Sequence, residues 1–280
     1  MPANGSLDCV PVPKRSRLAG LAAWGPKLTE RPFTTLEIDV MRATSGKPIT
    51  PTWGDAVVSP HRNMSPTLEL TYNPAVFNVA DIPAAMRIIL TPEGVPTEQR
   101  WRLETPYVAD LIGKEIEITP NTLLIDYGCG IGRIAKELIA RHGCRVIGVD
   151  ISPSMRALAV TYVQSDRFFT CPPQMLDAMI NRGVTVDAAI SIWVLQHCVF
   201  PDEDIARLRG ALKTAGRLFI LNNDDRAVPT IERGWVSDGL DIKTMLSRDF
   251  VLQTEGRPAL EHTSGAIAEL TFWASFQKRG

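Results

Sequence analysis

The sequence predicts an α/β fold with a doubly wound, mostly parallel sheet. Three observations support this fold class. Between residues 122 and 222, short apolar runs alternate with segments whose apolar residues recur at helical spacing. A glycine-rich loop separates the first apolar run from the helix that follows it. Near the C-terminus, 250–254 and 270–277 read as two strands joined by a loop, which predicts an antiparallel hairpin at one edge.

The stretch 122–150 reads as one strand–loop–helix–strand unit. Its first strand, 122–126, is apolar and ends in an acid, as expected of a buried parallel strand. Three alternating glycines then allow positive φ and the close approach of a ligand; they are Gly128, Gly130 and Gly132. Helical spacing over 131–139 predicts a helix that Gly143 ends, and 145–150 is a second strand. A unit of this length is typical of nucleotide binding.

The segments after this unit keep the same alternation. Ser152 and Pro153 fit the N-cap and the first residue of a helix. The predicted elements are, in order, a helix through 163, a strand at 167–171, a helix at 174–181, a strand at 186–193, a helix at 201–213, a strand at 217–222 and a helix at 231–247. Upstream, helices are predicted at 81–90 and 97–113, and Pro106 is expected to kink or split the second. Repeated strand–helix units with right-handed crossovers build a doubly wound sheet.

The distribution of proline divides the chain, because the first hundred residues hold 13 of its 21 prolines. Residues 1–30 lack sustained periodicity and are predicted to be a flexible tail. Short candidate strands at 33–40 and 67–72 lie in an N-terminal extension, 31–95, which we expect to cover a substrate. The α/β domain is expected to span 96–280.

The composition restricts the class of protein. A formal net charge of −1 and 45% hydrophobic residues suit a globular core, and they favour neither nucleic acid nor an anionic membrane as a partner. No apolar run approaches the roughly 18 residues of a membrane span. The five cysteines show no CxxC spacing, so we expect reduced thiols and a cytoplasmic location. The histidines have no neighbouring metal ligands, so no metal site is predicted.

An acid ends the second strand of the central unit. Asp150 lies 18 residues after Gly132, where it can accept hydrogen bonds from both ribose hydroxyls of an adenosine. That position fits a dinucleotide as well as S-adenosylmethionine. A dinucleotide fingerprint counted from Gly128 requires glycine or alanine where the chain has Arg133. Asp126, two residues before Gly128, would repel a pyrophosphate but can hold an ammonium group, so the loop favours a cationic ligand.

Two motifs resemble a known family. Residues 126–132 (DYGCGIG) and 146–152 (VIGVDIS) resemble the first two motifs of the class I S-adenosylmethionine-dependent methyltransferases. Residues 187–196 resemble the fourth strand of that family, and 212–221 resemble its fifth strand with the preceding helix end. The resemblance covers about 96–280. It implies S-adenosyl-L-methionine as the cofactor and a Rossmann-like seven-stranded sheet with an antiparallel last strand, here preceded by an N-terminal extension.

The resemblance and the position of the preceding helix indicate a set of cofactor contacts. The expected cofactor-binding residues are Asp126, Tyr127, Gly128, Cys129, Gly130, Asp150, Ile151, Met155, Gln174, Trp193, Arg102 and Tyr107. By analogy with the family, the loop residues would line the methionine part, Asp150 would bind the ribose, and Ile151 with Met155 would flank the adenine. Met155 also lies on a helix face that must be buried, so core packing is its alternative role.

Two of these contacts depart from the family pattern or lie outside its motifs. Where many members place an acid after the third strand, residues 170–174 are TCPPQ, which leaves the adenine amino group to Gln174 or to backbone groups. On the helix before the central unit, Arg102 or Tyr107 would reach the carboxylate of the cofactor.

His197 is the candidate catalytic residue. It follows the fourth strand at the expected cleft and would act as a general base where the acceptor must lose a proton; a structural histidine is the alternative. Residues 191–194 (SIWV) lack the Asn/Asp-Pro-Pro-aromatic signature of methyltransferases acting on nucleobases or protein glutamine. We therefore expect a small-molecule acceptor, methylated at oxygen or nitrogen. An NAD(P)-dependent oxidoreductase and a non-catalytic S-adenosylmethionine-binding scaffold stay open as alternatives.

Overall fold

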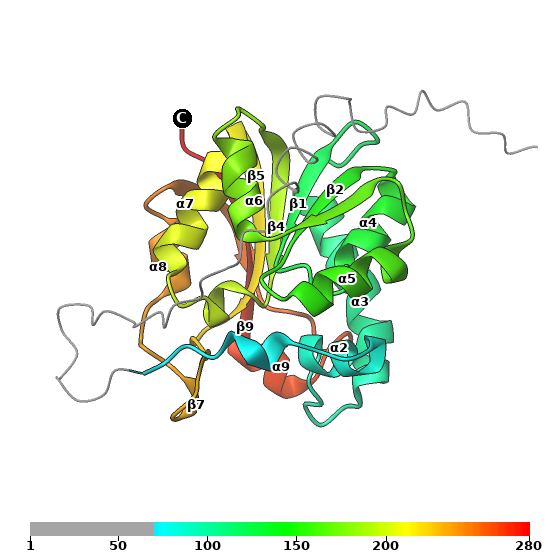
Figure 1. Ribbon diagram of the computed structural model, residues 1–280, viewed down its shortest axis with the longest axis vertical. Coiled ribbons are helices and arrows are strands. Elements are labelled where there is room, and N and C mark those ends of the chain that lie inside the picture. The colour runs from blue at the N-terminus through cyan, green and yellow to red at the C-terminus, as the bar shows by residue number, and fades with distance from the viewer. Residues whose placement is uncertain (1–69) are drawn as a thin grey trace, which may run out of the picture. The chain divides into compact units, whose positions relative to one another are not determined.

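A computed structural model describes residues 70–280 of the chain (Figure 1). These residues belong to one compact unit. The predicted tail 1–30, the candidate strand 33–40 and most of the candidate strand 67–72 lie outside the described residues.

The described part is built around a seven-stranded sheet of order β3-β2-β1-β4-β5-β9-β8. The strands are β1 (Leu123–Tyr127), β2 (Arg145–Val149), β3 (Phe168–Cys171), β4 (Val186–Ile192), β5 (Leu212–Asn223), β8 (Phe250–Gly256) and β9 (Thr271–Lys278). The first five pair in parallel, whereas β9 runs antiparallel to both of its neighbours. The predicted seven-stranded sheet with an antiparallel last strand is therefore confirmed.

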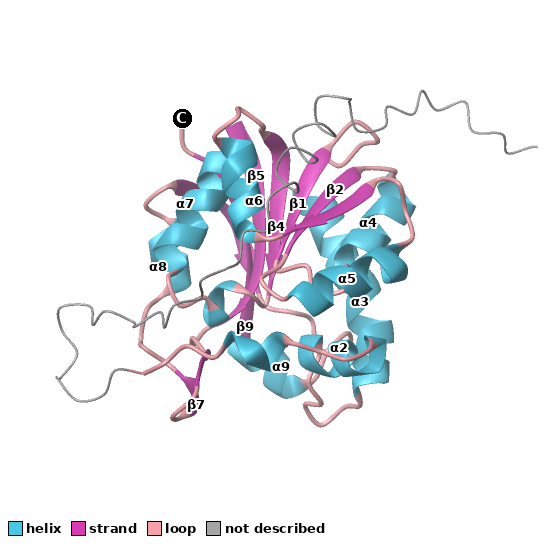
Figure 2. Cartoon of the chain, in the orientation of Figure 1, coloured by secondary structure: helices cyan, strands magenta, loops and turns pink. Residues whose placement is uncertain are grey.

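Helices cover both faces of this sheet (Figure 2). They are α2 (Ile82–Ile89), α3 (Thr97–Glu115), α4 (Arg133–His142), α5 (Pro153–Val163), α6 (Pro173–Ile180), α7 (Pro201–Ala211), α8 (Ile242–Leu246) and α9 (Gly265–Leu270), with the 3-10 turns η1 (Pro74–Phe77) and η2 (Leu195–His197). As predicted, Ser152 caps α5, and its hydroxyl accepts a hydrogen bond from the Met155 amide. Although Pro106 lies inside it, α3 runs as one helix of 19 residues.

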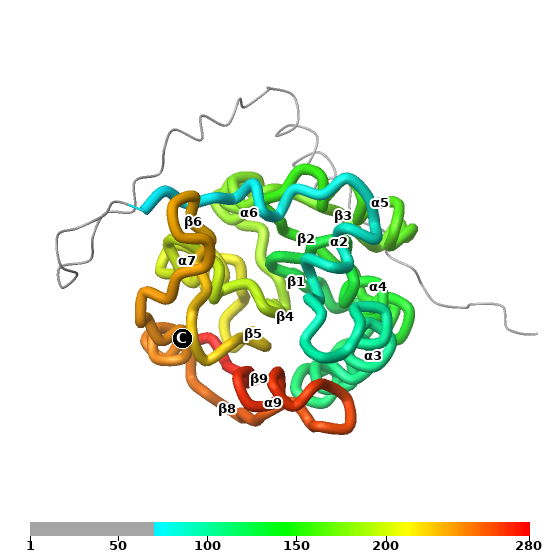
Figure 3. Tube along the Cα trace, turned by 90° about the horizontal axis from the view of Figure 1, so that it is seen from below, coloured from blue at the N-terminus to red at the C-terminus, as the bar shows by residue number. Residues whose placement is uncertain are grey.

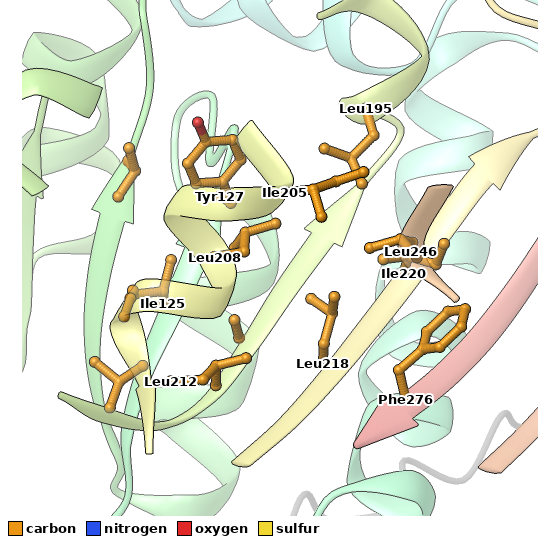
Figure 4. Close-up of a cluster of buried hydrophobic side chains, with 14 of the residues drawn as sticks. Ile125, Tyr127, Leu195, Ile205, Leu208, Leu212, Leu218, Ile220, Leu246 and Phe276 are labelled. Carbon is orange, nitrogen blue, oxygen red and sulfur yellow. The ribbon is translucent and has the colours of Figure 1, made fainter. Parts of the chain in front are cut away.

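Successive side chains of the central strands point to opposite faces of the sheet and pack into two separate hydrophobic cores. Ile125 of β1 packs with Leu208 of α7 and Leu218 of β5 in the core beneath α6, α7 and α8 (Figure 4). Leu124, one residue earlier, packs with Ile112 of α3 in the core on the opposite face. Because both faces are covered, all five residues of β1 are buried, and each large apolar side chain contributes about 1.5–3 kcal/mol of hydrophobic free energy.

Two predicted elements differ from the structure. The helix predicted at 231–247 is wrong over its first part, because β6 (Val228–Thr230) and β7 (Gly234–Val236) form a small hairpin there. Gly234 has a φ of +66°, which favours a turn over a helix, and the helix starts only after Asp241, whose carboxylate caps it. The loop predicted before the last strand contains the short helix α9, capped by Ser264.

The segment before α3 lies across the carboxyl ends of the parallel strands, beside the β6–β7 hairpin (Figure 3). The Asn73 amide donates to the Pro229 carbonyl at 2.9 Å, and the Ile231 amide donates to the Thr71 carbonyl at 3.0 Å. The helix predicted at 81–90 is confirmed as α2 and is capped by Asp81. Within residues 70–280, none of the helices is both long and apolar enough to cross a membrane.

Candidate cofactor site

The glycine loop joins β1 to α4 at the carboxyl edge of the sheet. Gly128, Gly130 and Gly132 have φ angles of +77°, +54° and +78°, a region that side chains with a Cβ rarely adopt. At Gly128 an added Cβ would lie 2.2 Å from Val194 Cγ2, so the loop passes too close to the end of β4 for any other residue. The positive φ expected of these glycines is confirmed.

Asp150 holds this loop against β2. Its Oδ2 accepts from the Gly130 amide and its Oδ1 accepts from the Ser152 amide, both at 2.8 Å. Burial raises the pKa of the carboxyl, and the two amide donors oppose that shift. A carboxylate oxygen has more than one acceptor direction, so Asp150 can also receive the hydroxyls of a ribose.

Asp126 is an acid with an unsatisfied oxygen. It is only 3% exposed, and its Oδ2 has no hydrogen-bond partner. Burial raises the pKa of its carboxyl to about 7, while Arg133 and a bond from the Ala135 amide pull it down. A buried carboxylate without a partner raises the free energy of the folded protein. A cationic hydrogen-bond donor from a ligand would lower it.

Arg133 supplies a buried positive charge near this acid. Its guanidinium lies 5.5 Å from the ring centre of Trp101 and 5.7 Å from that of Trp193, and its Nη1 donates to Thr105 Oγ1 at 3.2 Å. Burial lowers the pKa of Arg133 to about 10, so it stays charged near neutral pH. The indole Nε1 of Trp193 is also buried without a partner, and its backbone is held at a φ of +55°.

A second arginine nearby is already neutralised. Arg100 forms a two-point ion pair with Glu104, with Nε–Oε1 and Nη2–Oε2 distances of 2.6 and 3.0 Å, and both side chains are buried. Within residues 70–280, no ion pair joins Arg133 to Asp126. The site thus combines an unsatisfied acid, a buried cation and an unsatisfied N–H donor, a set that fits a ligand carrying both an ammonium and a carboxylate.

The comparisons with known proteins agree with this geometry. Residues 125–220, which run from within β1 to within β5, match the family model described as a methyltransferase domain. This match agrees with the resemblance of these residues to the class I S-adenosylmethionine-dependent methyltransferases. The magnesium protoporphyrin IX methyltransferase of Synechocystis, solved with bound SAH, shares the fold with a TM-score of 0.50 and 16% identity, over 69% of this chain and 93% of that one.

Two curated relatives match the methyltransferase region more closely in sequence. The ubiquinone biosynthesis O-methyltransferase of Bartonella quintana is 29% identical over 123 residues, 44% of this chain and 46% of the relative. The tRNA U34 carboxymethyltransferase of Alcanivorax borkumensis is 28% identical over 135 residues, 45% of this chain and 39% of the relative. The chain therefore spans less than half the length of the curated relatives it matches.

Several side chains expected to contact the cofactor have other partners in the structure. Tyr127 points to the opposite face of the sheet, where its hydroxyl donates to the Asp204 carboxylate and accepts from Arg207 Nη1 at 2.8 Å. Met155 is buried with Ala85 in a small core beside the loop, a position that fits the alternative of core packing. Cys129 is buried in the loop, and its thiol faces the Gly130 carbonyl.

The contacts expected from the flanking elements are dispersed. Arg102 lies on the exposed side of α3, and Gln174 is exposed at the start of α6. Tyr107 stacks on His262 with ring centres 4.4 Å apart, and its hydroxyl accepts from the Ala259 amide. The carbonyl of Ile151 accepts from Arg156 Nη1 at 3.1 Å, and its side chain is half-buried. None of these four side chains joins the Asp126 cluster through the contacts described here.

Sequence reasoning missed the role of the buried arginines. In the sequence, Arg133 was used only to exclude a dinucleotide fingerprint. Its position directly after three glycines also indicates that it could contact a ligand bound at the loop. Arg100 and Glu104 are four residues apart in α3, a spacing that suits an exposed ion pair equally well and so gives no signal of burial. Their burial follows from the packing of α3 against α2 and α4, which no local pattern shows.

His197 lies at the end of β4 in a cluster of aromatic rings. Its Nδ1 donates to the Ala227 carbonyl at 2.6 Å, and its ring centre lies 5.1 Å from that of Trp235 and 5.9 Å from that of Phe77. Its Nε2 lies 3.3 Å from Gln196 Nε2. Burial lowers the pKa of His197, so the imidazole is neutral at neutral pH. In the described part of the chain, no group of three potential metal ligands comes together.

Proposed function

We propose that this chain transfers a methyl group from S-adenosylmethionine to a small-molecule acceptor, at oxygen or nitrogen. The observation that carries the proposal is the unsatisfied pair of buried atoms, Asp126 Oδ2 and Trp193 Nε1, beside the buried Arg133 guanidinium. Asp126 would accept from the ammonium of the methionine part. Arg133 and the Trp193 indole would donate to its carboxylate, and Asp150 would accept from the ribose hydroxyls.

When bound, S-adenosylmethionine supplies a methyl group on a sulfonium, already activated for displacement. The contribution of the chain is to orient that group and to exclude water, an effect worth about 7–11 kcal/mol in well-oriented reactions. His197 would take the proton of a hydroxyl or amine acceptor on Nε2, because Nδ1 carries the hydrogen donated to the Ala227 carbonyl.

Two considerations support a small acceptor. The formal net charge of −1 offers no excess of positive charge for binding nucleic acid. The rings of Phe77, His197 and Trp235 gather beyond the carboxyl end of β4, where they offer an aromatic surface to an organic molecule. One curated relative is named for ubiquinone biosynthesis and another for tRNA modification. The class of acceptor therefore needs a direct test.

Calorimetry tests the cofactor part of the proposal. S-adenosylhomocysteine should bind the wild type, and Trp193→Phe, which removes one donor to a charged group, should weaken it about 10-fold. 5′-Methylthioadenosine lacks the amino acid end, so its affinity should be the same for both proteins. Trp273→Phe is the matched control, because that indole donates to the Arg257 carbonyl on β9. Binding of NADH without S-adenosylhomocysteine would refute the proposal.

Incubation with methyl-labelled cofactor tests the acceptor. The protein is mixed with a small-metabolite extract in one reaction and with total tRNA in another. Label is expected in the small-molecule fraction. Label in tRNA would overturn the acceptor class, and cofactor binding without label in either fraction would favour the scaffold alternative.

A further inference from the structure

Residues 71–89, here called the strap, are joined to the β6–β7 hairpin at their first end by a single antiparallel bridge. The hydrogen bonds of Asn73 to Pro229 and of Ile231 to Thr71 flank a single antiparallel bridge between Tyr72 and Thr230. Strands that pair in this way are held mainly by backbone hydrogen bonds, which can be exchanged for bonds to water. This end of the strap is therefore joined to the acceptor side of the site by contacts that can be released.

The middle of the strap reaches the start of α5, directly after Asp150. The Val79 amide donates to Ser154 Oγ at 2.9 Å, and Ser152 Oγ donates to Asn78 Oδ1 at 3.1 Å. Between these contacts and the hairpin, Phe77 packs against the rings of His197 and Trp235. One short stretch of chain thus contacts both the ribose end of the cofactor site and the candidate base.

The far end of the strap covers the glycine loop. A Cβ built on Gly130 would meet Ile89 Cδ1 at 2.7 Å, so the Ile89 side chain lies directly against the glycine whose bare backbone serves to admit a ligand. Ala85 of α2 packs with Ile131 and Met155 beside the same loop. The strap therefore lies across the route by which a ligand would reach the glycine loop from the strand ends.

Most side chains of the strap are only partly buried, whereas the end of α2 is tied to α3 by hydrogen bonds. No residue of η1 is fully buried, and Ala85 is the one buried residue of α2. Segments with so few buried contacts open at a small fraction of the free energy of unfolding. By contrast, the Leu90 carbonyl accepts from Thr97 Oγ1 at 2.8 Å, and the Thr91 carbonyl accepts from the buried Arg100, which ties the end of α2 to α3.

We propose that the strap is a lid hinged near Leu90, which opens to exchange the cofactor and, on closing, completes the acceptor pocket with Phe77. This inference rests on the proposed function, because it takes the ligand under the strap to be S-adenosylmethionine. Closure over the cofactor brings Phe77 against His197, so the acceptor pocket is complete only after the cofactor is in place. Phe77 is then a positioning residue, and the cofactor is expected to bind first.

A reversible cross-link tests the lid. Tyr72 and Thr230 form the pair that does not exchange hydrogen bonds in an antiparallel bridge, where Cα atoms lie about 4.5 Å apart, within the range of a disulfide. In the full chain carrying Tyr72→Cys and Thr230→Cys, the disulfide is formed with tritiated S-adenosylhomocysteine bound. Release into excess unlabelled ligand should then be at least 10-fold slower than after reduction. Equal rates in the oxidised and reduced forms would refute the lid.

Two controls make the result specific. Thr230→Cys alone, under the same oxidising conditions, should release ligand at the rate of the wild type. Phe77→Ala should release ligand about 5-fold faster without any disulfide chemistry, and an unchanged rate would remove Phe77 from the closing mechanism. A wild type that binds no S-adenosylhomocysteine would instead refute the proposed function, so the two failures are distinguishable.

Discussion

At the scale of single residues, the loss of water on burial controls the pKa values of the two charged groups in the site. Asp126 and Arg133 both lose water, and each has a pKa displaced toward its neutral form, Asp126 upward and Arg133 downward. Such displacement is costly in the free protein and is relieved when a ligand supplies the missing charges. A zwitterionic ligand, as proposed above, would supply the partners that these groups lack.

The charge of Asp126 should destabilise the free protein at alkaline pH. Its pKa rises from 3.8 to about 7 on folding, so the native state retains a proton that the unfolded chain loses, and stability falls as the pH rises through this window. At about 1.4 kcal/mol per pH unit, the cost approaches about 4 kcal/mol above pH 7.

Asp126→Asn removes this cost, so the variant should be more stable than the wild type near pH 8 and keep less than half of that advantage near pH 5. Urea unfolding at both pH values measures the difference. Calorimetry should show that the same variant binds S-adenosylhomocysteine at least 10-fold more weakly, because the ammonium loses its charged partner. The same stability difference at both pH values would contradict the assigned burial of charge.

Protonation of His197 should lower the reaction rate on the acidic side of the pH–rate profile. Because burial lowers its pKa below the ordinary 6.5, the neutral, proton-accepting form predominates at pH 7, and kcat should fall only as the pH drops through the lowered value. With the acceptor found by labelling, His197→Ala should lose this pH dependence and about 100-fold in kcat. His142→Ala, at the end of α4, is the matched control. An unchanged pH profile in His197→Ala would show that His197 is not the base.

At the scale of elements, the loop between β1 and α4 depends on positive φ and on close packing. The two requirements can be separated, because Gly183 has a similar φ of +81° but no atom within 4 Å of an added Cβ. Gly128, with a φ of +77°, would place its Cβ against Val194. The comparison distinguishes backbone strain from steric exclusion.

Gly183→Ala should cost about 1–2 kcal/mol of stability, the ordinary penalty for a left-handed residue. Gly128→Ala should cost a further 1–3 kcal/mol, because Val194 must move from its packed position. Chemical denaturation of the two variants measures both values. Equal losses would show that Val194 yields easily and that the loop is not closely packed.

At the scale of the whole molecule, the last strand completes the sheet. β9 inserts between β5 and β8, and its Ala274 and Phe276 are fully buried. Without it, the hydrogen-bonding edges of both neighbours would be exposed and the core beneath α8 opened. The sheet is therefore complete only when the C-terminal residues are present.

A chain that ends after Leu270 should show no cooperative thermal unfolding, whereas removal of Gly280 alone should leave the transition unchanged. Near-ultraviolet circular dichroism, which reports fixed aromatic packing, measures the transition in both chains. A cooperative transition in the shorter chain would show that β1 to β5 and their helices fold without β9 and would contradict this dependence.

The sequence by itself determined the parts of the protein that depend on local pattern. Apolar runs predicted the seven strands of the main sheet, and helical spacing predicted α2 to α7. The residue types of 126–132 and 146–152 predicted the resemblance to the methyltransferases and the cofactor. The acid at 150 and the glycines of the loop were placed correctly at the strand ends, because a parallel sheet brings the carboxyl ends of its strands to one edge.

Only the tertiary structure decided which charges are buried and which segments meet. Arg133 and Arg102 are both arginines near a cofactor motif, yet packing buries the first between two tryptophans and leaves the second in solvent. The contact of the strap with the β6–β7 hairpin joins residues about 160 positions apart. Such contacts arise from packing between distant segments, and the pattern within a short window of sequence does not contain them.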